Sequence, residues 1–430
     1  MFLKFVLIQV AMMIHSQDVS AIGLTDAFVK NSGSENSSGA SIDHEKSSLK
    51  DAYDLLADNE ECHLMVVDDA AALKAEPITF NKSHGITIEG IESNGYRNTE
   101  ATIDCAVSAS SVLFNCAKHV EFKHLAFNFP MSRSNKHTII GAGSNSISLT
   151  ITKCRFVRVN ANQQNGAVVN ANAYNLVANN LMRVTAGVVT LNSVTCQDEK
   201  ETVTFSISPF SFIGASEVSL FGVAISKVNV LNGAAISIKD LVRNSTKVVI
   251  EGLNVTEVNS KGRNAGGLQI SLVSEESTAE IGRMSKCSFK SCTAPNGKSG
   301  AVFVKMPQAM SHLQLPSANN LDIDRSNIAR SSATSLFISA PDFEDFCDQE
   351  DAFEFAQNNY EKAELVKGEG EDYQLVIDTV VNGTNKLSDM VQKSSLSDKN
   401  KSISIIIITA VGLALMVALV IGFIISKLKD

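Results

Sequence analysis

A short pattern of apolar and polar positions recurs through the middle of the chain. It reads apolar-x-apolar-x-x-apolar-x-apolar, and its third apolar residue, here called the anchor, occurs eight times. The anchors are Ile91, Leu125, Cys154, Val194, Val223, Leu253, Cys287 and Leu321, separated by 34, 29, 40, 29, 30, 34 and 34 residues. The residue three places before the anchor is apolar in all eight units. A period of this length indicates a solenoid built from stacked units.

The alternation within each unit identifies the units as strands. Apolar and polar residues alternate on both sides of a two-residue slip, which is typical of two strands joined by a bend. A helical repeat would show 3.6-residue spacing and fewer β-branched residues, and leucine-rich repeats have a shorter period. We therefore predict an all-β fold, a right-handed parallel β-helix over residues 86–340, with the anchors pointing inward and stacking in register.

Asparagine recurs six residues after the anchor. It stands at Asn160, Asn229, Asn259 and Asn327, and Thr293 takes this place in the seventh unit. Asparagine tolerates the left-handed backbone that a sharp corner needs, and its side chain bonds to nearby backbone. Stacked asparagines also bond from rung to rung as a ladder. We predict that these four asparagines occupy the bend and form such a ladder.

Both ends of the repeat need caps, because open strand edges pair with other molecules. In the N-terminal region, residues 22–85, the segment Ser47 to Asp58 has helical spacing with Ser47 or Ser48 as N-cap. The apolar run from Leu64 to Val67 reads as an incomplete first rung. The repeat stops at Pro341, and we predict an acidic C-terminal cap over residues 341–385 and a polar stalk over residues 386–402.

The two ends of the chain predict the cellular location of the protein. Residues 1–21 read as a signal peptide, with Lys4 before an apolar run from Phe5 to Ile14 and cleavage after Ala21 or Ser16. Residues 403–426 are 24 residues without a charge, which as a helix reach ~36 Å and span a bilayer. We predict a type I single-pass protein of the plasma membrane, with the ectodomain outside and residues 427–430 as cytoplasmic tail.

Secretion makes two modifications relevant. The candidate N-glycosylation sites are Asn36, Asn81, Asn244, Asn254 and Asn382, and a sixth sequon at Asn400 lies close to the membrane. Eight cysteines in an oxidising compartment are able to form disulfides, but their connectivity stays open. Cys154 and Cys287, at anchor positions, fit equally well as small buried apolar residues.

The membrane segment carries small residues on one stripe, at Ala410, Ala414, Ala418 and Gly422. Small residues let two helices approach closely, so the stripe is compatible with self-association. Alanine and glycine are frequent in such helices, and this explains the stripe equally well.

Two segments resemble known repeats. Glu76 to Ser83, followed by Ile86 to Gly90, resembles the opening rungs of pectin-lyase-like right-handed β-helices. Cys287 to Cys292, followed by Gly300 to Val302, resembles the repeat of polymorphic membrane proteins and of large surface-protein families of protists. The resemblance covers roughly residues 47–340 and implies the fold rather than a function. The chain departs from the bacterial proteins by ending in one apolar helix instead of an outer-membrane barrel.

The distribution of charge and the candidate metal-binding residues limit which functions the sequence supports. The formal charge is −9, and Pro341 to Asp372 alone holds twelve acids and two lysines. The remainder is nearly neutral and has no domain-sized basic face, which argues against nucleic acid as partner. His119 and His124 stand beside Lys118 and Lys123, an arrangement that favours a solvated strand edge over a metal site. The sequence predicts no cofactor and no metal.

Enzymes of the β-helix class are the alternative. They need paired carboxylates, or acidic calcium ligands together with a base, on neighbouring rungs. The only Asp-Asp pair is Asp68-Asp69 in the N-terminal region, and no Gly-His occurs. We therefore predict a non-enzymatic cell-surface glycoprotein with a binding, adhesion or coat role. The sequence does not identify its glycan or protein ligand. The alternative is a membrane-anchored polysaccharide lyase or glycoside hydrolase.

Overall fold

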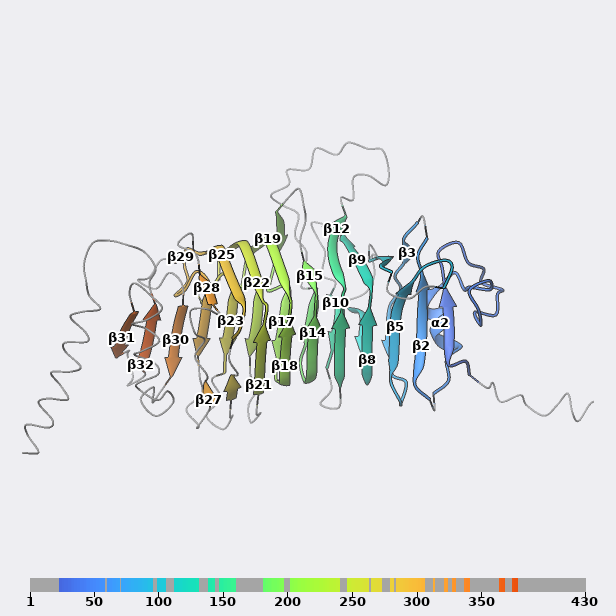
Figure 1. Cartoon of the computed structure of the whole chain (residues 1–430), viewed down its shortest axis with the longest axis horizontal. Helices are drawn as coiled ribbons and strands as arrows, with labels where there is room; N and C mark the ends of the chain where they lie inside the picture. The colour runs from blue at the N-terminus through green and yellow to red at the C-terminus, as the bar shows by residue number, and fades with distance from the viewer. Residues whose placement is uncertain are drawn as a thin grey trace, which may run out of the picture.

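The structure is a computed structural model of the full chain (Figure 1). It describes residues 23–58, 60–69, 71–95, 99–105, 112–130, 138–143, 147–159, 181–196, 202–239, 246–262, 264–272, 279–281, 284–305, 312–313, 321–323, 327–329, 336–340, 363–367 and 373–377. These residues form three long sheets and one short helix, and the strands stand side by side along an elongated rod (Figure 1).

The three sheets are the sides of one coil. Sheet 1 has ten strands, β1 (Asp26–Val29), β2 (Cys62–Val67), β5 (Ile86–Ile91), β8 (His119–Lys123), β11 (Ser148–Thr152), β14 (Gly187–Asn192), β18 (Ala215–Phe221), β21 (Thr246–Glu251), β24 (Ala279–Ile281) and β27 (His312–Leu313). Sheet 2 contains β3 (Leu73–Lys74), β6 (Ala101–Asp104), β9 (Leu125–Pro130), β12 (Arg155–Val159), β15 (Thr195–Cys196), β19 (Ala224–Val230), β22 (Asn254–Ser260), β25 (Cys287–Ala294) and β28 (Leu321–Ile323), with β16 (Val203–Phe205) on β19 and β29 (Ile328–Ala329) on β25. Sheet 3 contains β4 (Ile78–Phe80), β7 (Val112–Cys116), β10 (Thr138–Ala142), β13 (Met182–Val184), β17 (Phe210–Ile213), β20 (Ile236–Lys239), β23 (Leu268–Ser271), β26 (Val302–Lys305), β30 (Leu336–Ala340), β32 (Tyr373–Ile377) and β31 (Ala363–Lys367).

From β2 to β30 the chain passes in turn through sheets 1, 2 and 3, and each circuit is here called a rung. A rung adds one strand to each sheet, except that two rungs add a second short strand, β16 or β29, to sheet 2. Every pairing among these strands is parallel. The all-β, parallel, β-helix-like architecture predicted from the repeat is therefore confirmed at this level. Such sheets form because a single rung is too thin to bury its apolar side chains, whereas stacked rungs enclose a continuous core.

The anchors from Leu125 to Cys287 line one column of that core. The backbone N–H of the residue after one anchor donates to the carbonyl of the previous anchor, as from Thr195 to Cys154 (3.0 Å) and from Asn254 to Val223 (2.8 Å). Leu125, Cys154, Val194, Val223, Leu253 and Cys287 are at most 2 % exposed and belong to the main core. Leu321 pairs with Cys287 in the same register.

Ile91 is the exception, and the structure corrects its placement. It is buried, but in a small separate cluster with Met65 and Val67, against which Phe28 and Ile42 pack. The strand partner of Leu125 in the preceding rung is Ala101. The chain leaves sheet 1 at Ile91 and enters sheet 2 at Ala101, and the intervening stretch, described at residues 92–95 and 99–100, is here called the detour. Ala101 thus takes the place in the column that the local pattern assigns to Ile91.

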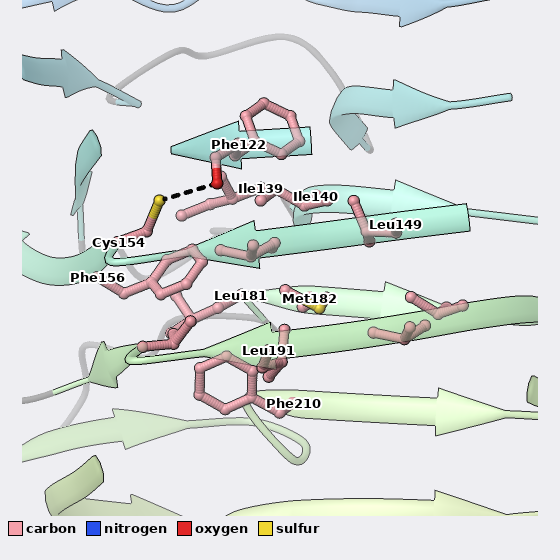
Figure 2. Close-up of a cluster of buried hydrophobic side chains, with 14 of the residues drawn as sticks. Phe122, Ile139, Ile140, Leu149, Cys154, Phe156, Leu181, Met182, Leu191 and Phe210 are labelled. Carbon is pink, nitrogen blue, oxygen red and sulfur yellow. Dashed lines mark hydrogen bonds between the residues drawn. The ribbon is translucent and has the colours of Figure 1, made fainter. Parts of the chain in front are cut away.

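Aromatic rings fill the core of the early rungs. Phe127 and Phe156 stack with ring centroids 5.1 Å apart, and Phe156 meets Phe210 edge to face at 5.6 Å. Figure 2 shows Phe122 and Phe210 pointing into the same interior from two strands, and Cys154 from the corner between β11 and β12. Such ring pairs stabilise the core beyond the area they bury.

The sharp corners use a left-handed residue, but not the predicted asparagine. The residue before the anchor has a positive φ in six successive rungs, at His124, Lys153, Ser193, Gly222, Gly252 and Lys286. A second left-handed position lies four residues after the anchor, at Lys227, Glu257 and Ser291. One left-handed residue reverses the inward–outward alternation and turns the strand sharply. Among the described residues, the asparagines of the repeat do not adopt this conformation.

The N-terminal end is closed by a helix and a loop. Helix α2 (Leu49–Asp54) begins after Ser48, whose side chain accepts a hydrogen bond from the Asp51 N–H, as predicted for an N-cap. Leu49, Ala52 and Tyr53 are buried in the core, and the Tyr53 ring meets Phe80 edge to face. The segment after β1 returns to pair with it, since the Lys46 N–H donates to the Phe28 carbonyl.

At the other end, the parallel order of sheet 3 gives way to an antiparallel one. Strand β32 pairs antiparallel with both β30 and β31, within the region where the sequence predicts the C-terminal cap. Within the described part of the chain, no helix has the length and apolar character needed to cross a bilayer. The predicted signal peptide, stalk, membrane segment with Ala410, Ala414, Ala418 and Gly422, and tail lie outside the described residues.

Candidate binding surface

The outer face of sheet 1 carries polar side chains in register from rung to rung. Five successive strands place Thr87, Glu121, Thr150, Thr190 and Ser219 opposite one another. Parallel strands repeat every ~4.8 Å, so these side chains form a regular outward column. Thr87 and Ser219 at the two ends of the column are buried, whereas Glu121, Thr150 and Thr190 are partly exposed, so the geometry suits a ligand that contacts these three rungs at once.

The middle of this face is uncharged. We define the neutral patch as Thr150, Thr152, Thr190, Asn192, Ser219 and Phe221 on strands β11, β14 and β18. Phe221 lies outward and half-buried next to the inward, fully buried Leu220. The patch is bounded by two ion pairs, Lys123–Glu121 and Lys286–Glu251, each with an N–O distance of 2.8 Å.

The outer face of sheet 2 carries the predicted ladder in part. Thr204, Asn229, Asn259 and Thr293 are in register. The Asn229 amide donates to the Thr204 hydroxyl at 3.5 Å, and the Thr293 hydroxyl donates to the Asn259 carbonyl at 3.1 Å. Asn160 lies outside the described residues.

Asn327 does not join this ladder, which corrects the prediction. Ile328 is the strand partner of Thr293, so Asn327 falls one place earlier and faces the core. It is fully buried, where its carbonyl accepts from the Cys292 N–H (2.8 Å) and its amide donates to the Phe289 carbonyl (2.9 Å). It therefore satisfies the backbone around the left-handed Ser291 of the neighbouring rung.

Charged groups gather at the corner between sheets 1 and 2, a cluster that sequence reasoning missed. Glu89 and Lys123 are register partners on adjacent strands, and Lys123 also pairs with Glu121. His124 follows at the corner and is 8 % exposed, not at a solvated edge as predicted, whereas His119 is exposed. Burial lowers the pKa of His124, Lys153 lowers it further, and Glu89 opposes the shift.

An ion pair fastens the detour to the coil. The Arg155 side chain donates to both carboxylate oxygens of Glu100, with 2.7 Å from Nε to Oε2. Arg155 is the strand partner of Ala126, which is the strand partner of Thr102. The small, buried Ala126 leaves room for the guanidinium to reach past its rung.

The candidate acids of the N-terminal region serve a structural contact. Asp69 accepts a hydrogen bond from the Ser32 N–H at 3.2 Å, and Asp68 is exposed beside it at the end of β2. In the part of the chain that the structure describes, no group of three or more His, Cys, Asp or Glu side chains is arranged to hold a metal ion.

The described sequons lie on the surface. Asn36, Asn81 and Asn254 are all exposed. Asn36 sits in the N-terminal loop, Asn81 follows β4 and accepts from the Tyr53 hydroxyl (2.8 Å), and Asn254 stands on the outer face of sheet 2. Asn244 and Asn382 lie outside the described residues.

The described cysteines are core residues. Cys62, Cys105, Cys116, Cys154, Cys196 and Cys287 carry free thiols and are buried. Cys292 is buried too, and its thiol donates to the Val255 carbonyl at 3.5 Å. Burial raises the pKa of Cys154 and of Cys196 to about 12 and that of Cys287 to about 11. Of the two interpretations that the sequence left open for Cys154 and Cys287, the structure supports small buried apolar residues.

Comparison with known proteins returned no match to a family model, to a curated protein or to a solved structure. The fold is therefore described by its geometry alone, as a three-sided coil of parallel strands.

Proposed function

We propose that the chain is a single-pass cell-surface glycoprotein whose coil is a right-handed, pectin-lyase-like β-helix with a binding, adhesion or coat role. The observation that carries this proposal is the set of polar side chains held in register on the outer face of sheet 1, from Thr87 to Ser219. A rigid rod with repeated outward groups meets an extended ligand at many points without rearranging, which limits the entropic cost of binding.

The cell-surface address is supported by the apolar segments at both chain ends and by the exposure of Asn36, Asn81 and Asn254. Deletion of residues 403–430 is the test. We expect this variant, expressed in a eukaryotic secretory host, to appear in the medium with glycans that an endoglycosidase removes. Retention of the shortened chain on washed membranes contradicts the single anchor, and secretion without glycans contradicts the glycoprotein assignment.

A second candidate function rests on the charged corner. Glu89 and Glu121 stand on adjacent strands with Lys123 between them, and His124 follows. Carboxylates on neighbouring rungs beside a neutral histidine are the groups that cleavage of an acidic polysaccharide requires. However, Glu89 is 6 % and His124 8 % exposed, which leaves little room for a sugar to reach either side chain.

We therefore expect the purified protein not to cleave pectin, polygalacturonate or related uronic-acid polymers, with or without calcium. The assay measures new reducing ends and the absorbance of unsaturated products. Turnover that disappears in Glu89→Gln, a variant with nearly unchanged side-chain shape, and persists in Glu257→Gln, a change at an exposed glutamate of sheet 2, reverses the assignment in favour of the enzyme.

A further inference from the structure

The neutral patch of sheet 1 combines one outward aromatic ring with hydroxyl and amide groups on three consecutive rungs. Thr150 is the strand partner of Thr190, and Thr190 is that of Ser219. Along the neighbouring column, Thr152 is followed by Asn192 and then by Phe221. We propose that this patch binds an uncharged polysaccharide that lies along the axis of the coil, an inference that rests on the proposed binding role.

The aromatic ring provides the apolar part of such a site. Phe221 is half-buried on the solvent side of β18, although the strand has enough apolar residues in its inward positions, Val218 and Leu220, to hold it in the core. The face of an aromatic ring is electron-rich, and the C–H groups on one face of a pyranose ring carry partial positive charge. A sugar ring stacked on Phe221 therefore gains both apolar contact and weak C–H···π attraction.

The surrounding groups provide the polar part. Threonine hydroxyls donate and accept, and the Asn192 amide does both through separate atoms. Asn192 is exposed and its carbonyl is oriented by the Ser193 hydroxyl, which donates to it at 3.1 Å. These groups repeat with the ~4.8 Å spacing of the rungs, so successive sugars of an extended chain meet equivalent partners.

The charge distribution selects against an acidic polymer. The lysines at the two ends of the patch, Lys123 and Lys286, are each paired with a glutamate. Glu217 and Lys153 border the patch with opposite signs, and Glu217 accepts a hydrogen bond from Ser219 at 3.1 Å. A uronate or sulfate would lose hydration and meet two neutralised lysines and the opposed charges of Glu217 and Lys153, whereas an uncharged sugar loses less.

The other two faces of the coil are less suited to this ligand. The sequon Asn254 stands exposed at the start of β22 on the outer face of sheet 2, where an attached glycan would cover the surface. On sheet 3 the outward column Ser237, Gln269 and Phe303 is at most 5 % exposed, with the Lys298 ammonium 5.9 Å from the Phe303 ring centroid. In the neutral patch Ser219 is also buried, with 4 % exposed, but Asn192 is exposed and Thr150, Thr152, Thr190 and Phe221 are partly exposed, so these five residues form the accessible part of the patch.

The test uses the full-length chain, purified in detergent and applied to immobilised hexasaccharides. The uncharged probes are cellohexaose, chitohexaose and laminarihexaose, and the acidic probes are hexagalacturonate and a heparin hexasaccharide. We expect binding to at least one uncharged probe and at least tenfold weaker binding by Phe221→Ala. Phe221→Tyr keeps the ring and should retain affinity, and Thr190→Val, which removes a hydroxyl at similar volume, should weaken binding severalfold.

Leu231→Ala is the matched control, because Leu231 is an exposed apolar residue (40 %) outside the patch, and it should leave binding unchanged. The midpoint of thermal unfolding is measured for every variant, so that a loss of folding is not read as a loss of contact. Binding to the acidic probes only, or equal binding by wild type, Phe221→Ala and Thr190→Val, overturns the proposal.

The outcomes also separate this proposal from the proposed function. If the wild-type chain binds none of the uncharged probes but adheres to cells or to an immobilised protein, the polysaccharide site is refuted and the binding role stands. If the chain binds no probe, no cell and no protein, both are refuted.

Discussion

The same corner of the coil is built in two different ways in consecutive rungs. Between β8 and β9 the chain turns on a single left-handed residue, His124, and Leu125 enters the core at once. Between β5 and β6 the strand instead continues to Ile91, pairs there with Val67, and detours before returning at Ala101. The two rungs stay in register, because the Ala101 N–H donates to the His124 carbonyl at 3.0 Å.

The difference shows what determines the core position. Ile91 and Leu125 have the same local pattern of apolar neighbours, yet only Leu125 lies in the main core. Pairing with the neighbouring rung fixes the column, and the length of chain at the corner adjusts to it. An insertion at a corner therefore costs a solenoid little, because loop-closure entropy rises slowly with length.

Charge placed in the column should have the largest effect. Leu125→Asp or Leu253→Asp buries an unpaired carboxylate in the core, and we expect a loss of about 4 kcal/mol or more of unfolding free energy. Ile91→Asp should cost clearly less, because its cluster holds only Met65 and Val67 as buried partners among the described residues. Urea unfolding followed by circular dichroism measures all three. Equal losses would show that Ile91 belongs to the main core.

Glycines at equivalent places in the two kinds of corner should also differ. A Cβ at Gly90 would overlap the carbonyl oxygens of His124 and Thr99, so Gly90→Ala should cost about 3 kcal/mol. At Gly222, with φ of 60°, the nearest atoms to an added Cβ lie 3.7 Å away, and only the left-handed backbone penalises alanine, by about 1 kcal/mol. Gly222→Asn should be nearly neutral. The shifts in the thermal unfolding midpoint should follow this order, and similar shifts for both alanines would contradict it.

The fold was predictable from the sequence because the apolar pattern repeats, and its inward residues are those that the pattern marks. The column from Leu125 to Cys287 and the N-cap at Ser48 follow from local rules of this kind. The position of Ile91 outside the main core does not follow from local rules, because only the pairing of Ala101 with Leu125 reveals the detour. Likewise, a shift of one residue moves Asn327 from the outer ladder into the core.

The candidate surface was less predictable than the fold. Which outward residues share a column depends on the register of strands some thirty residues apart, and unequal rung lengths hide it. Phe221 reads as one more apolar residue until Asn192 and Thr152 are placed beside it. The left-handed corners were not predicted for a different reason, since Lys153, Ser193 and Lys286 are not residue types that favour a positive φ.

Acid should lower the stability of the protein through the one-residue corner at His124. The pKa of this buried imidazole is lowered, so the unfolded chain, with an ordinary value of 6.5, binds the proton first. Stability is then lost as the pH falls below about 6.5. His124→Asn keeps a residue suited to a left-handed backbone and should flatten the loss between pH 7 and pH 5. His119→Asn, at an exposed histidine, is the control, and equal pH profiles for wild type and His124→Asn would contradict the prediction.

The ion pair that holds the detour should contribute least to the free energy of unfolding. Arg155 and Glu100 are half and one-third exposed, and pairs of this kind stabilise a fold by about 0.2–1 kcal/mol. Arg155→Met should cost no more than this at low salt and less at high salt, because ions screen the pair. A double-mutant cycle with Glu100→Gln isolates the coupling. A coupling above about 2 kcal/mol would mean that the detour is an integral part of the rung.

The buried cysteines report where along the rod the structure opens locally. Cys62, Cys116, Cys154, Cys196 and Cys287 lie on different rungs, and each thiol is shut away from solvent. Alkylating reagents attack the thiolate, so each sulfur is labelled only when its own rung separates from the stack. The order in which these cysteines react in dilute denaturant would record the direction in which the coil unzips, from the aromatic rungs near Phe80 or from the aliphatic ones near Leu253.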